Sequence, residues 1–110
     1  MGGCDFVTTG FGKDAKEAYQ NAKERAIWEH GNDPYNGTIS TTSGFSIRKI
    51  EGRQTEKAID QMIEKVIENA DKRECVCIPL AGAALKKAKE RAGLKGKKVN
   101  GYIFAGIAAE

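Results

Sequence analysis

The sequence predicts an α+β fold in one domain that spans residues 1–110. Three observations lead to this prediction. Residues 56–68 place apolar side chains at helical spacing between charged ones, which indicates an amphipathic helix. Residues 75–78 and 99–108 form apolar runs with residues that favour β-strands. Turn-forming residues separate these segments, and no repeat or low-complexity linker divides the chain.

The first strand is expected at residues 5–9, where two apolar residues precede two threonines. Gly10-Phe11-Gly12-Lys13 would end this strand in a tight turn. A complete phosphate loop needs a glycine five residues before its Gly-Lys pair and a serine or threonine after it. Val7 and Asp14 occupy these positions, so the turn is not that motif. A weaker contact to an anion stays open as the alternative.

The first helix is expected to start at Asp14, because Glu17 follows three residues later and completes a capping box. Mostly small side chains then recur at helical spacing on one face, which favours close packing on a sheet. They are Ala15, Ala18, Tyr19, Ala22 and Ala26. Gly31, directly after His30, is expected to end the helix.

Residues 32–37 are rich in turn formers and are expected to form a loop. Beyond them, residues 38–42 and 45–50 alternate polar and apolar side chains around Ser43-Gly44. This pattern predicts a β-hairpin, and one long bulged strand is the alternative.

The second half of the chain predicts two helices and two strands. Thr55 is expected to cap a helix whose inner face carries Ala58, Ile59, Met62, Ile63, Val66 and Ile67. Residues 75–78 predict a buried strand. A short helix over residues 82–92 would follow and end at Gly93. The apolar run at residues 99–108 predicts a central or well-covered strand.

The expected order of elements is β-α-β-β-α-β-α-β. Its first six elements match the split βαβ arrangement of a ferredoxin-like core, and the last two form an α-β extension. We expect a mainly antiparallel sheet with the helices on one face. If the hairpin is a single strand, the order becomes β-α-β-α-β-α-β with more parallel pairing.

No apolar run approaches 18 residues and no signal-peptide pattern opens the sequence, so we expect a cytoplasmic protein without a membrane partner. Three cysteines cannot all form disulfides with one another. Cys75 and Cys77 would point to one face of a strand, where core thiols are the expected role. The alternative is a zinc site that adds Cys4 and His30, but the spacing is unusual for zinc. We therefore predict no metal and no cofactor.

Basic residues concentrate near the C-terminus. Seven lie between residues 86 and 98 against one acid, Glu90, in a chain whose net charge is +3. These residues are Lys86, Lys87, Lys89, Arg91, Lys95, Lys97 and Lys98. Basic side chains near aromatic residues, here Tyr102 and Phe104, are typical of contacts to phosphates and stacked bases. A solvated helix face is the alternative interpretation.

His30 is the only histidine. It is a candidate base or ligand near Glu29 and Asp33, although a histidine at a helix end also interacts favourably with the terminal carbonyls. Tyr35 and Asn36 in the following loop complete the candidate binding residues. No catalytic residue is assigned, because no serine or cysteine stands in a nucleophile signature and no carboxylate pair has acid–base spacing. An enzyme is therefore the less favoured class.

The alanines of the first helix are followed by Glu29-His30-Gly31 and by Tyr35-Asn36-Gly37-Thr38-Ile39. This helix with an E-x-G and Y-x-G-T-I loop resembles small uncharacterised proteins of phages and some bacteria. The resemblance covers roughly a quarter of the chain. It departs at Asn32-Asp33-Pro34, where those proteins carry a glycine-rich turn. The resemblance implies no activity, and it adds a phage accessory or anti-defence role to the hypotheses.

These features favour a non-enzymatic binding module for a phosphate-bearing ligand, either a nucleotide or a nucleic acid, acting as a homo-oligomer. The first alternative is a protein-interaction factor that inhibits a host protein. The second alternative is a small enzyme that uses His30.

Overall fold

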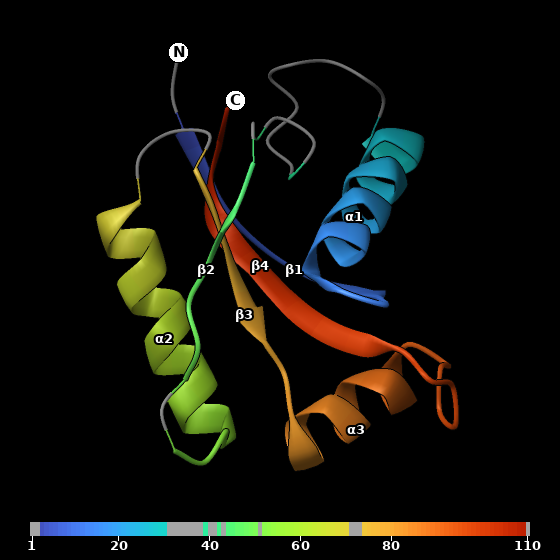
Figure 1. Cartoon of the computed structure of the whole chain (residues 1–110). Helices are drawn as coiled ribbons and strands as arrows, with labels where there is room; N and C mark the ends of the chain where they lie inside the picture. The colour runs from blue at the N-terminus through green and yellow to red at the C-terminus, as the bar shows by residue number, and fades with distance from the viewer. Residues whose placement is uncertain are drawn as a thin grey trace.

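The computed structural model describes residues 3–30, 39, 42, 44–50, 52–70 and 74–109. Strands and helices alternate along these residues (Figure 1). The elements are β1 (Gly3–Gly12), α1 (Ala15–His30), β2 (Ser46–Ile47), α2 (Glu56–Asn69), β3 (Cys75–Pro79), α3 (Gly82–Arg91) and β4 (Asn100–Ala109). This is the order that we expected if the predicted hairpin is a single strand.

The strands form one mixed sheet in the order β1-β4-β3-β2. β4 lies inside the sheet and pairs antiparallel with both β1 and β3, so Phe104 has Thr8 on one side and Cys77 on the other. β2 is short and pairs in parallel with β3. The α+β class is therefore confirmed. A mainly antiparallel four-stranded sheet with three helices is consistent with the predicted ferredoxin-like fold.

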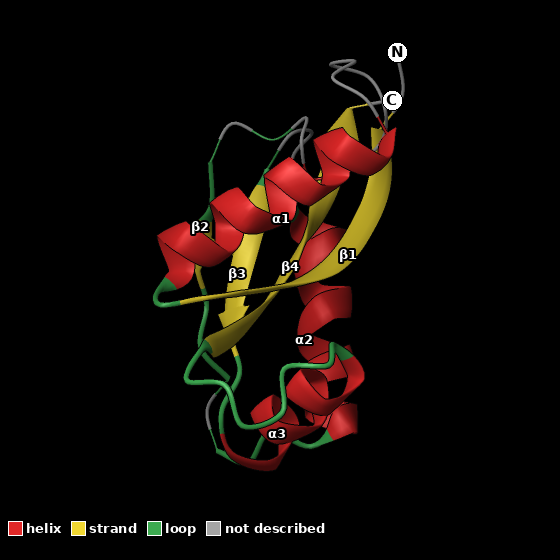
Figure 2. Ribbon diagram, turned by 90° about the vertical axis from the view of Figure 1, so that its right-hand side faces the viewer, coloured by secondary structure: helices red, strands yellow, loops and turns green. Residues whose placement is uncertain are grey.

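The helices cover both faces of the sheet, which corrects the expectation of one covered face (Figures 1 and 2). α1 packs on the face that carries Cys75, Cys77 and Phe104, whereas α2 packs on the face that carries Val76 and Ile78. Successive residues of β3 point to opposite faces, so its apolar run is buried only if both faces are covered. The parallel pair of β2 and β3 also needs a crossover connection, which α2 supplies.

β1 continues to Gly12, although residues 10–13 were expected to form a turn. A Cβ atom on Gly10 would lie 2.7 Å from the carbonyl oxygen of Ala18, and a Cβ atom on Gly12 would lie 2.7 Å from the nitrogen of Ala18. The two glycines therefore let the backbone of α1 approach β1 closely and have a packing role.

Two predicted helix starts are confirmed by their capping contacts. In α1 the N–H of Glu17 donates to Oδ1 of Asp14 at 2.9 Å, and the Glu17 carboxylate accepts from the N–H of Lys13 at 3.2 Å. In α2 Oγ1 of Thr55 accepts from the N–H of Ala58 at 3.1 Å.

Side chains of α1 cover part of the free edge of β1. Nδ2 of Asn21 donates to the carbonyl oxygen of Phe11, and Nη2 of Arg25 donates to the carbonyl oxygen of Thr9, both at 2.9 Å. An exposed strand edge offers unpaired backbone groups to other chains, and these two contacts occupy its carbonyls.

The expected strand at residues 38–42 lies mostly outside the described residues. Ile39 and Thr42 are described, and both lie outside any strand. The N–H and Oγ1 of Thr42 both donate to the carbonyl oxygen of Ile39, at 3.0 and 2.7 Å, so a turn stands where a strand was expected. This turn buries both side chains.

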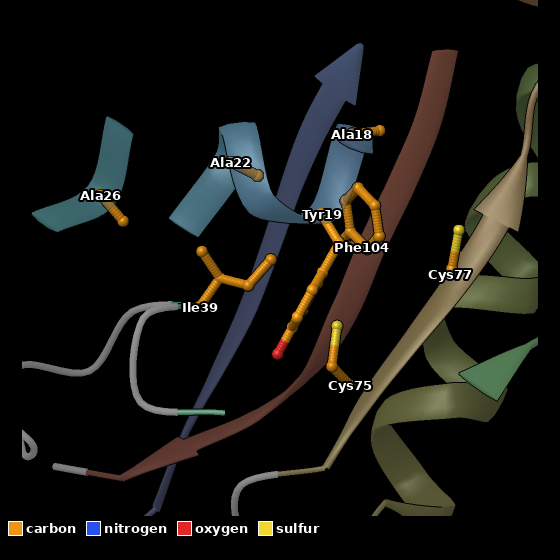
Figure 3. Close-up of a cluster of buried hydrophobic side chains, with 8 residues drawn as sticks. All are labelled: Ala18, Tyr19, Ala22, Ala26, Ile39, Cys75, Cys77 and Phe104. Carbon is orange, nitrogen blue, oxygen red and sulfur yellow. The ribbon is translucent and has the colours of Figure 1, made fainter. Parts of the chain in front are cut away.

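The core on the α1 side of the sheet is built from small and aromatic side chains (Figure 3). Ala18, Ala22 and Ala26 bring α1 close to the sheet, as their spacing predicted. The ring of Tyr19 lies 5.7 Å from that of Phe104, and both side chains are buried. This side is therefore closed by packing, and the opposite side holds the open surface described next.

Candidate functional site

The face of the sheet that carries α2 is only partly covered. α2 packs on Val76, Ile78 and Ala105, and α3 lies beyond the end of the sheet where β4 begins (Figure 1). Between α2, α3 and β1 lies an open groove of about 1390 Å³, which we call the α2–α3 groove. Its floor is apolar and is lined by Val7, Phe11, Ile50, Ile59, Ile63, Leu80 and Ile103.

The floor of the groove leaves apolar surface in contact with solvent. Val7 in β1 is 51% exposed, and of the residues on α2 only Val66 is buried. Small-molecule sites are typically concave, largely apolar and about 300–1,000 Å³ in volume. The α2–α3 groove is larger than this range and has room for a ligand of nucleotide size.

Gln54 holds the starts of α2 and α3 together at one end of the groove. Its Nε2 donates to the carbonyl oxygen of Pro79 and its Oε1 accepts from the N–H of Ala81, both at 2.8 Å. The side-chain amide thus pairs with the backbone where β3 ends and α3 begins. This double contact fixes the spacing between the two helix starts.

Basic side chains outnumber acidic ones around the groove. The lining contains Arg25, Arg53, Lys87 and Arg91 as basic residues, with Glu56 and Asp60 as acidic residues. Nζ of Lys87 donates to Oε1 of Glu56 at 2.7 Å and joins α3 to the first turn of α2. The hydrogen bond and charge of Lys87, together with the charge of Arg91, lower the pKa of Glu56. Glu56 therefore lies within the field of both cations.

Two of the basic side chains have no hydrogen-bond or ion-pair partner among the residues that the structure describes. Within the described part of the chain, Arg53 and Arg91 make no hydrogen bond or ion pair. Arg91 lies one turn after Lys87 on α3, so the two side chains share a face of the helix. Residues 81–84 at the start of α3 also line the groove, and the N-cap residue Ala81 makes no side-chain cap hydrogen bond. The helix dipole favours an anion at this start of α3, whereas Arg91, the last residue of the helix, lies at the opposite end.

The structure divides the predicted basic tract. Lys87 and Arg91 line the α2–α3 groove. The other members of the tract are outside the lining: Lys86, Lys89, Lys95, Lys97 and Lys98. Among them, Nζ of Lys89 donates to the carbonyl oxygen of Lys97, which ties α3 to the loop before β4. The remaining side chains are exposed.

The other predicted binding residues lie at a different place in the chain. His30 is the last residue of α1, and its side chain lies outside the described residues. Tyr35 and Asn36 also lie outside the described residues. Their predicted roles, and the enzyme hypothesis that uses His30, stay predictions.

Sequence reasoning missed part of the groove. Arg53 and Gln54 fall between the predicted strand and helix, and Phe11 falls in a predicted turn. The sequence does place Gln54 at the start of a helix, because this residue directly precedes the predicted helix cap at Thr55. No local pattern, however, brings Phe11 and Ile103 onto the floor below α2. That depends on the pairing of β1 with β4, in which Thr9 lies opposite Ile103.

The cysteines of β3 are core residues. Cys75 and Cys77 are both buried and unpaired, and burial raises the pKa of each thiol to about 12. A buried thiol that stays protonated is a poor nucleophile and a poor metal ligand. Among the described residues no group of three or more histidine, cysteine, aspartate or glutamate side chains is arranged to hold a metal ion. The side chain of Cys4 lies outside the described residues.

Comparison with protein-family models, with curated proteins and with solved structures found no match to this chain. None of the described helices combines the length and the apolar character needed to span a bilayer. The resemblance of residues 15–39 to small phage and bacterial proteins stays a prediction.

Proposed function

We propose that this protein is a non-enzymatic binding module for a phosphate-bearing ligand, a nucleotide or a nucleic acid, and that the α2–α3 groove is its binding site. One observation carries the proposal. The groove combines an apolar floor with Lys87 and with Arg53 and Arg91, which have no hydrogen-bond or ion-pair partner among the described residues. Arginine and lysine are suited to phosphate oxygens, and an apolar surface suits the face of a base.

The position of the charges suggests how such a ligand lies. Lys87 and Arg91 stand on one face of α3 at the side of the groove, Lys87 in the middle of the helix and Arg91 at its last residue. A phosphate group there would meet both side chains, and a base would lie along Phe11 and Ile103. Lys86, Lys95, Lys97 and Lys98 are exposed on α3 and in the following loop, where a polynucleotide backbone would find further charge.

Binding is tested by titrating the purified protein at low salt with ATP, with AMP and with a single-stranded oligonucleotide. Arg91→Glu is expected to weaken binding by about tenfold or more, because it replaces a charge-assisted contact with repulsion. Lys16→Glu is the matched control, because it makes the same kind of charge change at an exposed position of α1 outside both the groove and the basic tract. Undetectable affinity for all three probes would contradict the proposal, and so would affinities that Arg91→Glu leaves unchanged.

A protein-interaction factor is the second candidate, and Trp28 supports it. Its side chain is 87% exposed on α1, beside the partly exposed Ile27. Tryptophan is enriched among residues that dominate protein interfaces. The expected partner is a host protein or, in a homo-oligomer, a second copy of the chain. Native mass spectrometry of the wild type and of Trp28→Ala tests this candidate, which fails if both are monomeric and copurify with no protein partner.

A further inference from the structure

The ion pair between Glu56 and Lys87 lies across the proposed binding site. Nζ of Lys87 lies 2.7 Å from Oε1 of Glu56, and the side chains are 56% and 75% exposed, respectively. Both residues line the groove. In the protein as described, one of the cations proposed to hold phosphate is thus engaged by a carboxylate of the same chain.

The place of Glu56 is also one that favours a negative charge. It is the first residue of α2, directly after the cap at Thr55, where the helix dipole stabilises anions. Arg91 lies one turn along α3 from Lys87 and also acts on this carboxylate. A ligand phosphate placed at Lys87 would therefore occupy the same electrostatic position as the Glu56 carboxylate.

We propose that Glu56 is an internal competitor for ligand phosphate in the α2–α3 groove, which makes the site selective for nucleotides with two or more phosphate groups. This inference rests on the proposed function. An exposed ion pair stabilises a protein only slightly, so a ligand can replace it. A single backbone phosphate of a nucleic acid carries one negative charge, as the carboxylate does, and gains little from the exchange.

A polyphosphate gains more contacts than it displaces. One phosphate group takes the Lys87 ammonium from Glu56, and a second reaches Arg91, whose guanidinium has no hydrogen-bond partner among the described residues. Side chains four residues apart on a helix lie about 5–6 Å from each other at Cβ, which suits two adjacent phosphate groups. Discrimination between ATP and AMP therefore depends on the competition at Lys87.

Asp60 supplies a matched control within the same groove. It lies one turn after Glu56 on α2 and lines the groove, and it has no hydrogen bond or ion pair among the described residues. Asp60→Asn and Glu56→Gln each remove one negative charge from the groove. Only Glu56→Gln also releases Lys87. Competition therefore predicts a larger change for Glu56→Gln than for Asp60→Asn, and it predicts that the change depends on Lys87.

The experiment measures the affinities of ATP and AMP for the wild type, Glu56→Gln and Asp60→Asn, and repeats both substitutions in a Lys87→Gln background. Glu56→Gln is expected to tighten ATP binding about two- to fivefold, to tighten AMP binding by more, and to lose its effect when Lys87 is replaced. Equal effects of Glu56→Gln and Asp60→Asn, or an effect that persists without Lys87, would overturn the inference while the proposed function stands. Failure of every variant to bind either nucleotide would overturn the inference, and the proposed function would fall with it only if the oligonucleotide also fails to bind.

Discussion

The hydroxyl oxygen of Tyr19 lies 2.5 Å from Oγ1 of Thr42, in a buried contact that ties α1 to the turn at Ile39. Oγ1 of Thr42 donates to the carbonyl oxygen of Ile39, so the Tyr19 hydroxyl is the donor in this pair. Burial raises the pKa of Tyr19, which keeps this proton in place. The carbonyl oxygen of Thr42 accepts from Nζ of Lys23 at 3.0 Å. Thr42 is therefore the central residue of a small buried polar network.

Replacing either partner of this contact should destabilise the fold, but by different amounts. Tyr19→Phe removes one hydrogen bond and leaves Thr42 bound to Ile39, so the free energy of unfolding should fall by about 1 kcal/mol. Thr42→Val leaves the buried Tyr19 hydroxyl without its acceptor and removes one of the two donors to the Ile39 carbonyl, which should cost about 2–3 kcal/mol. Urea denaturation of both variants measures the difference. Equal losses would mean that Thr42 is not the central residue.

The close approach of α1 to β1 predicts a specific sensitivity to a single methyl group. Gly10→Ala would place its Cβ 2.7 Å from the Ala18 carbonyl oxygen and 2.9 Å from the Phe104 ring, so about 1–3 kcal/mol of stability should be lost through overpacking. Gly44→Ala is the control, because no atom lies within 4 Å of its new Cβ. Thermal denaturation should separate the two variants, and similar melting temperatures would rule out the tight contact.

Most elements of this fold could be predicted because their signals are local. The capping box at Asp14, the cap at Thr55 and the alanine face of α1 each depend on residues within a few turns of one another. Gly10 shows where local reasoning fails. A glycine in a turn and a glycine under a helix look alike in sequence, and only the packing of α1 on β1 distinguishes them.

The candidate site was predicted only in part, because some of its residues share a local pattern and others are brought together only by the fold. The concentration of basic residues identified Lys87 and Arg91. Lys87 and Arg91 line the groove, whereas Lys86 and Lys89 do not, because of the face that α3 turns toward α2. The sequence around α3 does not determine which face that is. The floor residue Val7 belongs to β1, which reaches the groove only because β1 pairs with β4 at the edge of the sheet.

The buried thiols predict a loss of stability at alkaline pH. Burial raises the pKa of Cys75 and of Cys77 to about 12 from an ordinary value of 9.0. Above pH 9 the unfolded chain releases these protons while the folded chain keeps them, so stability is full below pH 9 and falls as the pH rises toward 12. Each thiol should cost about 1.4 kcal/mol between pH 7 and pH 10.

The slope of stability against pH isolates this effect from the cost of a core substitution. Urea denaturation of the wild type, Cys75→Ala and Cys77→Ala at several pH values from 7 to 10 gives that slope. Each variant should start from a lower stability and then decline less steeply than the wild type. Parallel curves for all three proteins would show that the thiols titrate alike in the folded and unfolded chains.

Gln54 should control the end of the α2–α3 groove. Gln54→Ala removes the hydrogen bonds to the Pro79 carbonyl and the Ala81 N–H, and the expected loss of stability is about 1–3 kcal/mol. Gln54→Glu still accepts from Ala81 but repels the Pro79 oxygen, so its loss should be intermediate. Gln61→Ala, at an exposed position of α2, should change stability by less than about 0.5 kcal/mol.

Hydrogen exchange then tests whether Gln54 acts at the junction itself. If its side chain holds the start of α3, the Ala81 amide should exchange faster in Gln54→Ala than the loss of global stability requires. The amide of Ala92, which donates to Ala88 at the other end of α3, should follow global stability alone. Uniform acceleration at both amides would show that Gln54 contributes to the fold as a whole and does not specifically position α3 beside the groove.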